Sequence, residues 1–91
     1  MTESLEARIA STEKQLIAAV NELGATLTGD LRVSEEVAAQ LLGTTPGGLK
    51  QARHEGRGPR AYAIGAGSRT RISYRLSELA TYIEESFESF Y

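Results

Sequence analysis

The sequence lacks cysteine and contains a single histidine, His54. Without cysteine the chain can form neither disulfides nor thiolate zinc sites, and a reducing compartment is its natural setting. One histidine cannot build a metal site by itself. We therefore expect no metal, no cofactor and no cysteine nucleophile.

Long hydrophobic runs are missing as well. No apolar stretch approaches the roughly 20 residues that are needed to cross a bilayer. The first ten residues, MTESLEARIA, are polar and acidic, unlike a secretory signal peptide. Ninety-one residues suffice for one small domain, and a second independent domain is not expected. These features predict a cytoplasmic protein with no membrane partner.

Groups suited to catalysis are scarce. His54 has no carboxylate near it in the sequence except the adjacent Glu55, and the serines and threonines lie where helix caps and turns need them. Glu84, Glu85 and Glu88 have the spacing of a solvated helix face. The sequence therefore does not predict an enzyme.

Positive charge is concentrated in the middle of the chain. Residues 44–75 hold seven of the ten Lys and Arg residues and one acid, a net charge of +6, whereas each flank is near −4. The overall charge of −2 hides this polarity. A basic centre between acidic ends is typical of a surface that meets phosphate.

An amphipathic helix is predicted over residues 4–23, with Ser4 as its N-cap and Gly24 at its end. Its apolar positions recur at spacings of three, four and seven, and they are Leu5, Ile9, Leu16, Val20 and Leu23. This stripe suits a helix that covers the core of its own chain. It is also close to a heptad seam, which suits a helix that pairs with a second copy. Both roles remain open at this point.

Two short helices follow a brief extended segment at 31–33. The first is expected to start at an N-cap, Ser34, and to stop at Gly43. The second runs from Pro46 to about His54, with Pro46 at the first helical position, where its missing N–H costs nothing. Two short helices joined by a tight glycine turn are the helix-turn-helix arrangement.

The second short helix has a predicted inner and outer face. Thr45 is its expected N-cap, and Leu49 and Ala52 are expected to face the preceding helix. The side expected to face solvent or a ligand carries Gly48, Lys50, Gln51, Arg53 and His54.

A β-hairpin is predicted over residues 62–74, where YAIG and RISY flank a turn built on Gly65 and Gly67. Arg69 and Arg71 lie on or beside its tip. The glycines do not form a phosphate loop, because the GxxxxGK[ST] pattern is missing and no helix begins there.

A closing helix is predicted after the hairpin, with Ser77 and Glu78 as its cap. Its apolar positions are Leu76, Leu79, Ala80, Ile83 and Phe87. Phe90 and Tyr91 are expected to pack in the core or at a dimer edge.

The order of these elements resembles the small winged helix-turn-helix proteins of the MerR-like superfamily, especially phage excisionases and AlpA-type regulators. The resemblance covers residues 33–84, more than half of the chain. The matching residues are Ser34, Glu36, Ala38, Leu41, Leu42, Gly43, Thr45, Leu49, Arg53, Gly56, Gly58, Pro59, Gly65, Tyr74, Arg75, Ser77 and Leu79.

The resemblance implies a fold that is mainly α with a small β-hairpin, a winged helix-turn-helix (31–91) preceded by an extra N-terminal helix (1–24). It implies sequence-specific binding of double-stranded DNA in a bacterial host cell or nucleoid, with helix 46–54 in the major groove and wing 62–74 on adjacent backbone or minor groove. Excisionase and transcription regulator are the roles it implies. The partners would be duplex DNA and a homodimer or DNA-templated oligomer.

The candidate DNA-binding residues are Thr44, Thr45, Gly48, Lys50, Gln51, Arg53, His54, Arg57, Arg60, Arg69 and Arg71. Gln51 is suited to read adenine, and Lys50 or Arg53 to read guanine. Thr45 and the wing arginines would mainly position the duplex. Arg75 suits a structural ion pair with Glu78 or another acid at least as well as a DNA contact.

Two other functions fit the same sequence. The N-terminal helix departs from a minimal excisionase and suits a small terminase-like packaging subunit that recruits a motor. Alternatively, the helix-turn-helix is a scaffold for protein interaction, with the acidic helices docking a partner. Steep salt dependence of duplex binding, with about five phosphates neutralised, would separate DNA binding from the interaction module.

Overall fold

The computed structural model describes residues 3–90, and the side chains as far as residue 88. The expected packing of Phe90 and Tyr91 therefore lies outside the described side chains. The elements in chain order are α1 (Leu5–Leu23), β1 (Arg32–Ser34), α2 (Glu35–Leu42), α3 (Pro46–His54), β2 (Tyr62–Ile64), a 3-10 turn η1 (Gly67–Arg69), β3 (Arg71–Arg75) and α4 (Leu76–Phe90). The described chain is thus mainly helical, with one antiparallel sheet.

Side-chain caps begin the first three helices where the sequence predicts them. The hydroxyl groups of Ser4, Ser34 and Thr45 accept hydrogen bonds from the backbone three residues later, at 3.1, 3.2 and 3.0 Å. Helices α1 and α2 end at Gly24 and Gly43, which both adopt the left-handed conformation. These predicted boundaries are confirmed to within a residue.

The sheet has three strands in the order β1-β3-β2, where the sequence predicted only a hairpin. β1 pairs with β3, so that Val33 lies opposite Tyr74. The segment before β1 turns at Leu31, which has a φ of 63°, and the Thr28 hydroxyl accepts a hydrogen bond from the backbone N–H of Arg32 at 2.8 Å. Local sequence showed an extended segment here but not a partner some 40 residues away.

Helix α4 starts at Leu76, directly after β3. The Leu76 N–H donates to the carbonyl of Leu31 at 2.9 Å, so the first turn of α4 is tied to the segment before β1. The prediction that Ser77 and Glu78 cap this helix is therefore wrong, because Ser77 is already within it. The strand and the helix are joined without a loop.

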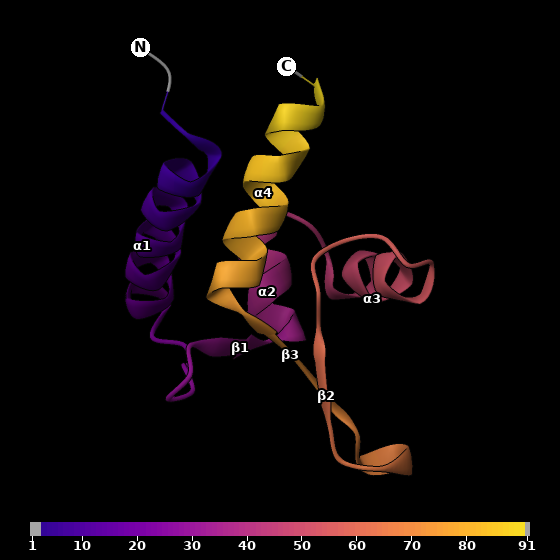
Figure 1. Ribbon diagram of the computed structural model, residues 1–91. Helices are drawn as coiled ribbons and strands as arrows, with labels where there is room; N and C mark the ends of the chain where they lie inside the picture. Colours follow the sequence, from indigo (N-terminus) through magenta and orange to yellow (C-terminus); the bar gives the residue numbers. More distant parts are fainter. Residues whose placement is uncertain (1–2, 91) are drawn as a thin grey trace.

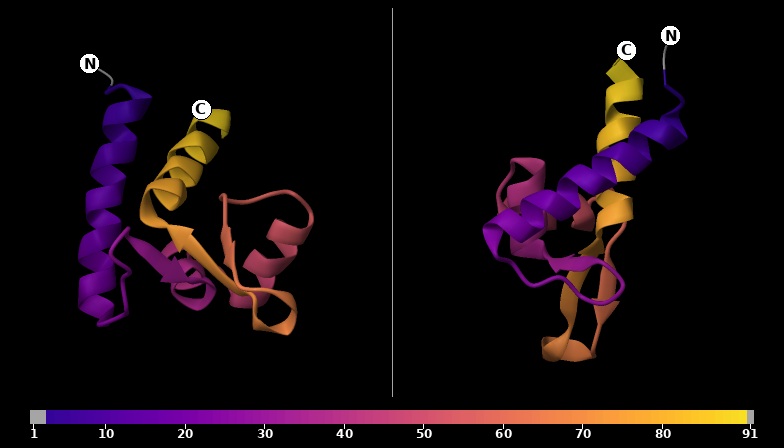
Figure 2. Two further views of the ribbon diagram at one scale, coloured as in Figure 1. Left: turned by 60° about the horizontal axis from the view of Figure 1, so that its bottom comes forward. Right: turned by 90° about the vertical axis from the view of Figure 1, so that its left-hand side faces the viewer.

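Helix α1 packs against α4 (Figure 1) and crosses it at an angle, as the right-hand view of Figure 2 shows. Its Leu16 and Val20 belong to the same hydrophobic core as Val33, Tyr74 and Leu79. Two roles were left open for α1, and the first, covering the core of its own chain, is confirmed. Pairing with a second copy stays a prediction, and Leu23 near the end of α1 is 50% exposed.

The α1–α4 pair is also held by charge. Nε of Arg8 donates to Glu84 at 3.1 Å, a second guanidinium nitrogen pairs with Glu88, and the Thr12 hydroxyl donates to Glu84 at 2.8 Å. These bonds join the first half of α1 to the second half of α4, and the N-terminal end of α1 and the C-terminal end of α4 lie opposite the hairpin tip in Figure 1. The acidic C-terminal flank is thus partly neutralised within the fold.

Candidate nucleic-acid interface

Helix α3 presents a polar outer face over an apolar anchor. Leu49 is only 4% exposed and belongs to the core, while Ala52 is half-buried, as predicted for the inner face. Lys50, Gln51 and His54 are exposed. Lys50 and His54 have no ion pair or side-chain hydrogen bond among the described residues. Two cationic or titratable groups on α3 are therefore free to meet a ligand.

Gln51 makes one exposed bond. Its amide nitrogen donates to Glu55 one turn later at 3.2 Å. Because this bond is long and solvent-exposed, its net contribution to stability is small, and a base edge can replace it. The Gln51 side chain is thus accessible, and only one weak hydrogen bond holds its orientation.

The hydroxyl groups of Thr44 and Thr45 pack closely against Gly48 at the start of α3. The Thr45 hydroxyl caps the helix by accepting from the Gly48 N–H. A Cβ atom at position 48 would lie 3.1 Å from the hydroxyl oxygens of both Thr44 and Thr45. Gly48 therefore leaves room for these hydroxyls, and all three residues are exposed.

The β2–β3 hairpin projects from the body and carries further cations. Its tip, η1, lies on the side of the molecule away from α1, as α3 does (Figures 1 and 2). Arg69 and Arg71 are exposed, and neither forms an ion pair within the described residues. Arg71 lies opposite Ile64 in the register, and Ile64 is 55% exposed.

Arg53 does not face solvent as predicted. Its Nε and a terminal nitrogen donate to the two carboxylate oxygens of Glu35 at 3.1 and 3.2 Å, and its side chain is 23% exposed. The hydrogen bonds from Arg53 to Glu35 raise the pKa of the guanidinium. Arg53 therefore joins α3 to α2 and does not belong to the free outer face.

Arg57 and Arg75 are also paired. Nε of Arg57 donates to Glu55 at 2.9 Å, an exposed pair that a phosphate can compete with. Arg75 pairs with Asp30 at 3.3 Å and lies over the Tyr62 ring at 5.1 Å from its centre. The expected structural ion pair of Arg75 is confirmed, with Asp30 as the acid and not Glu78.

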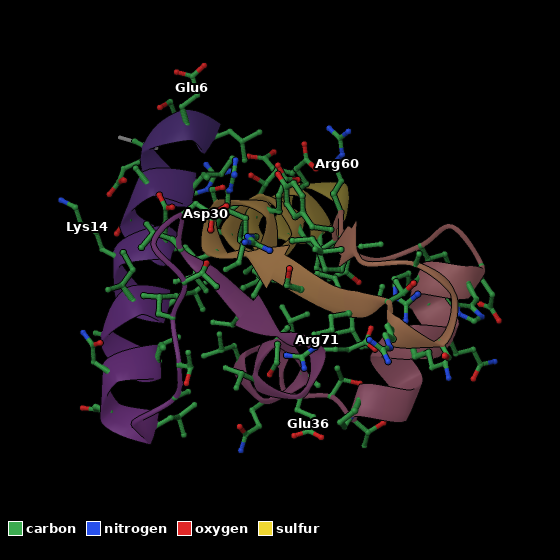
Figure 3. The ribbon with its side chains drawn as sticks, turned by 90° about the horizontal axis from the view of Figure 1, so that it is seen from below. Glu6, Lys14, Asp30, Glu36, Arg60 and Arg71 are labelled. Carbon is green, nitrogen blue, oxygen red and sulfur yellow. The ribbon has the colours of Figure 1, made fainter. Side chains whose placement is uncertain are left out.

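Arg60 lies apart from the hairpin cations. It lines a groove with Glu78, Tyr82 and Glu85 of α4. Figure 3 shows Arg60 and Arg71 at well-separated places in the view from below. The structure thus does not bring Arg60 together with the outer face of α3 and the hairpin tip, because the loop that carries it runs against α4.

A carboxylate that the sequence analysis did not single out holds this region together. Glu35 accepts from Arg53 and also from the Tyr74 hydroxyl at 2.9 Å. Burial and the bond to Glu35 raise the pKa of Tyr74 to about 12. The sequence offered only one signal for Glu35, its place in the first turn of a helix, which the helix dipole explains equally well.

Comparison with protein-family models, curated proteins and solved structures finds no significant match. No helix in the described part of the chain is both long enough and apolar enough to cross a bilayer. Residues 3–90 also contain no group of three acidic, histidine or cysteine side chains placed to hold a metal ion.

Proposed function

We propose that this chain is a sequence-specific double-stranded DNA-binding protein with a winged helix-turn-helix fold. In this proposal α2 and α3 are the helix-turn-helix, α3 enters the major groove, and the β2–β3 hairpin is the wing on adjacent backbone or minor groove. The observation that carries the proposal is the set of unpaired cations on α3 and the wing, namely Lys50, Arg69 and Arg71.

The roles of the exposed residues follow from their chemistry. Gln51 matches the donor and acceptor pair of adenine, and Lys50 matches the acceptors of guanine. Each such match contributes roughly 1–3 kcal/mol of discrimination against a wrong base. Arg69 and Arg71 lie on a projecting hairpin and suit phosphate, which positions the duplex without reading it.

The salt dependence is a quantitative consequence of the ion pairs. Arg53 and Arg75 form ion pairs within the fold, and Arg60 lies beside acids of α4. Arg69, Arg71 and Arg57, whose exposed pair with Glu55 a phosphate can displace, leave about three cations for phosphate. The logarithm of affinity should therefore fall with the logarithm of salt concentration at a slope of about −2.7. Five contacts would have given a slope of about −4.5.

The biological role is proposed as phage or prophage excisionase or transcription regulator, in a bacterial cytoplasm or nucleoid. A small terminase-like packaging subunit uses the same DNA contacts and is the alternative. The protein-interaction module, in which the acidic helices dock a partner, is the second alternative.

The experiment that tests the proposal is selection of bound fragments from a random duplex library at about 0.15 M salt. An enriched motif, followed by the mass of the complex on it, is the expected result. Inverted copies would indicate a dimeric regulator, and short direct repeats an excisionase. Failure to enrich any sequence, together with binding that ignores salt, would overturn the proposal.

A further inference from the structure

One hydrogen-bonded cluster joins three elements of the proposed DNA-binding unit. Glu35 is the first residue of α2, Arg53 is in the last turn of α3, and Tyr74 is in β3, the second strand of the wing. The Glu35 carboxylate receives two bonds from Arg53 and one from the Tyr74 hydroxyl. Glu35 and Arg53 are 19% and 23% exposed, and Tyr74 is fully buried.

We infer that Glu35 and Arg53 are positioning residues that set the orientation of α3 relative to the wing, and that Arg53 does not contact DNA. Helix α3 and strand β3 both pack against α2, and Glu35 of α2 bonds to each of them. The part of this inference that concerns DNA rests on the proposed function. The part that concerns orientation does not.

The geometry of the pair supports a positioning role. A guanidinium that meets a carboxylate through two nitrogens is fixed in plane and direction, whereas a single bond leaves it free to swing. Loss of the carboxylate would leave the buried Tyr74 hydroxyl without its acceptor. Nε of Arg53 and the Tyr74 hydroxyl therefore share one oxygen atom, Oε2 of Glu35, so that a displacement of this carboxylate moves the partner of both residues.

The alternative role for Arg53 is a DNA contact, with phosphate or with guanine. It is a cation at the end of a helix that is proposed to enter a groove, and a quarter of its side chain reaches solvent. Against this, breaking a partly buried pair to reach phosphate would strand the Glu35 carboxylate in a low-dielectric site. The two roles make different predictions for salt dependence and for orientation in the absence of DNA.

The orientation is measurable without DNA. Because the chain has no cysteine, Gly47→Cys in α3 and Ser68→Cys in the wing tip can carry a single pair of spin labels. A Cβ atom at Gly47 meets nothing within 4 Å. We expect one narrow distance distribution, which broadens or shifts in Glu35→Gln and in Arg53→Lys, with the double variant no worse than either single one.

Two controls match the perturbation. Arg8→Lys disturbs the Arg8–Glu84 pair, which joins α1 to α4 and whose two side chains are 20% and 15% exposed. Glu36→Gln removes a neighbouring first-turn charge from α2. Both should leave the distance distribution unchanged. An unchanged distribution in Glu35→Gln and Arg53→Lys, checked to be folded by circular dichroism, would overturn the inference.

The inference that Arg53 does not contact DNA is tested by measuring binding to the selected duplex and to a random one. For Arg53→Lys and Glu35→Gln alike we expect about tenfold weaker binding of the selected site, an effect within about twofold on random duplex, and no change in salt slope. A loss in Arg53→Lys that Glu35→Gln does not share would make Arg53 a base contact and overturn the inference. Equal weakening on both duplexes in Arg53→Gln, with a slope reduced by about one, would make Arg53 a phosphate contact and overturn the inference. If the unmodified chain binds no duplex, the proposed function fails, and the label distances still decide the positioning role.

Discussion

The carbonyl oxygen of Arg69 lies against the α-carbon of Gly65, so that a Cβ atom at position 65 would be only 2.5 Å away from it. Gly65 also has a φ of 112°, which side chains rarely adopt. Gly65→Ala should therefore distort the wing tip at a local cost of about 1–3 kcal/mol. Faster amide hydrogen exchange over residues 64–71, with the helices unchanged, is the expected measurement.

Gly67 provides the comparison for that substitution. Its φ is 59°, and a Cβ atom there meets nothing within 4 Å. Gly67→Ala should cost about 1 kcal/mol and leave the tip conformation intact. Equal exchange in the two variants would show that the contact with Arg69 does not shape the tip.

Tyr74 makes the fold sensitive to alkali. Its pKa is raised from an ordinary value near 10 to about 12, by burial and by the bond to Glu35. The neutral phenol is the form that the fold favours, so its stabilisation is complete below about pH 10 and is lost as the pH rises toward about 12. Tyr74→Phe should remove this alkaline loss, and should lower the free energy of unfolding at neutral pH by about 1–2 kcal/mol.

Urea unfolding at pH 7 and at several values above pH 10 checks the Tyr74 prediction. Tyr82→Phe, at an exposed position on α4, is the control and should keep the alkaline loss. A Tyr74→Phe variant that loses stability in alkali as steeply as the unmodified chain would contradict it.

Asp30 has the opposite effect at low pH. The Thr28 hydroxyl donates to its carboxylate, and the guanidinium groups of Arg32 and Arg75 lie beside it, so its pKa is held well below the usual range. The ionised form is favoured by the fold. This stabilisation is present above the ordinary Asp pKa of about 3.9 and fades as the pH falls below it.

Asp30→Asn should reduce the loss of unfolding free energy that the chain undergoes at low pH. The difference in urea midpoint between pH 7 and about pH 3 should shrink in this variant. Glu6→Gln, on the outer side of α1 (Figure 3), should leave that difference as it is in the unmodified chain. No shrinkage in Asp30→Asn would mean that the Asp30 ion pairs do not contribute to acid stability.

Under the proposed function, the outer face of α3 should determine base preference, whereas the wing should contribute affinity for any duplex. Lys50→Ala and Gln51→Ala should relax base preference, each by about 1–3 kcal/mol at the base it reads. Arg69→Ala and Arg71→Ala should weaken all duplexes alike and reduce the salt slope by about one each. Fluorescence anisotropy with selected and random duplexes at several salt concentrations measures both effects. Four variants that behave identically would contradict this division.

Much of the fold could be predicted because its signals are local. Ser34, Gly43, Thr45 and Pro46 place the ends of two helices through bonds that span only three or four residues. The strand pairing of Val33 with Tyr74 could not be predicted in this way. It depends on a partner far along the chain, and three residues are too short to show an alternating pattern.

The basic segment that contains the candidate site could be predicted from the sequence, but which of its cations remain unpaired could not. Charge counting placed seven cations in one segment. It could not show that Arg53 turns inward to Glu35, that Arg60 lies beside α4, or that Arg75 is shared between Asp30 and Tyr62. Such pairings are set by tertiary packing, and they decide how many cations remain for a ligand.

The packing of α1 on α4 has a consequence for biosynthesis. A ribosome makes Leu23 some 50 residues before it makes Leu76, which at 5–20 residues per second takes roughly three to ten seconds. During that interval the apolar stripe of α1 has no α4 to cover it, and a lone helix of 19 residues is only marginally stable in water. β1 likewise waits for β3. The tertiary structure of the nascent chain therefore forms late, and α1 is stabilised by its packing partner only after α4 has been made.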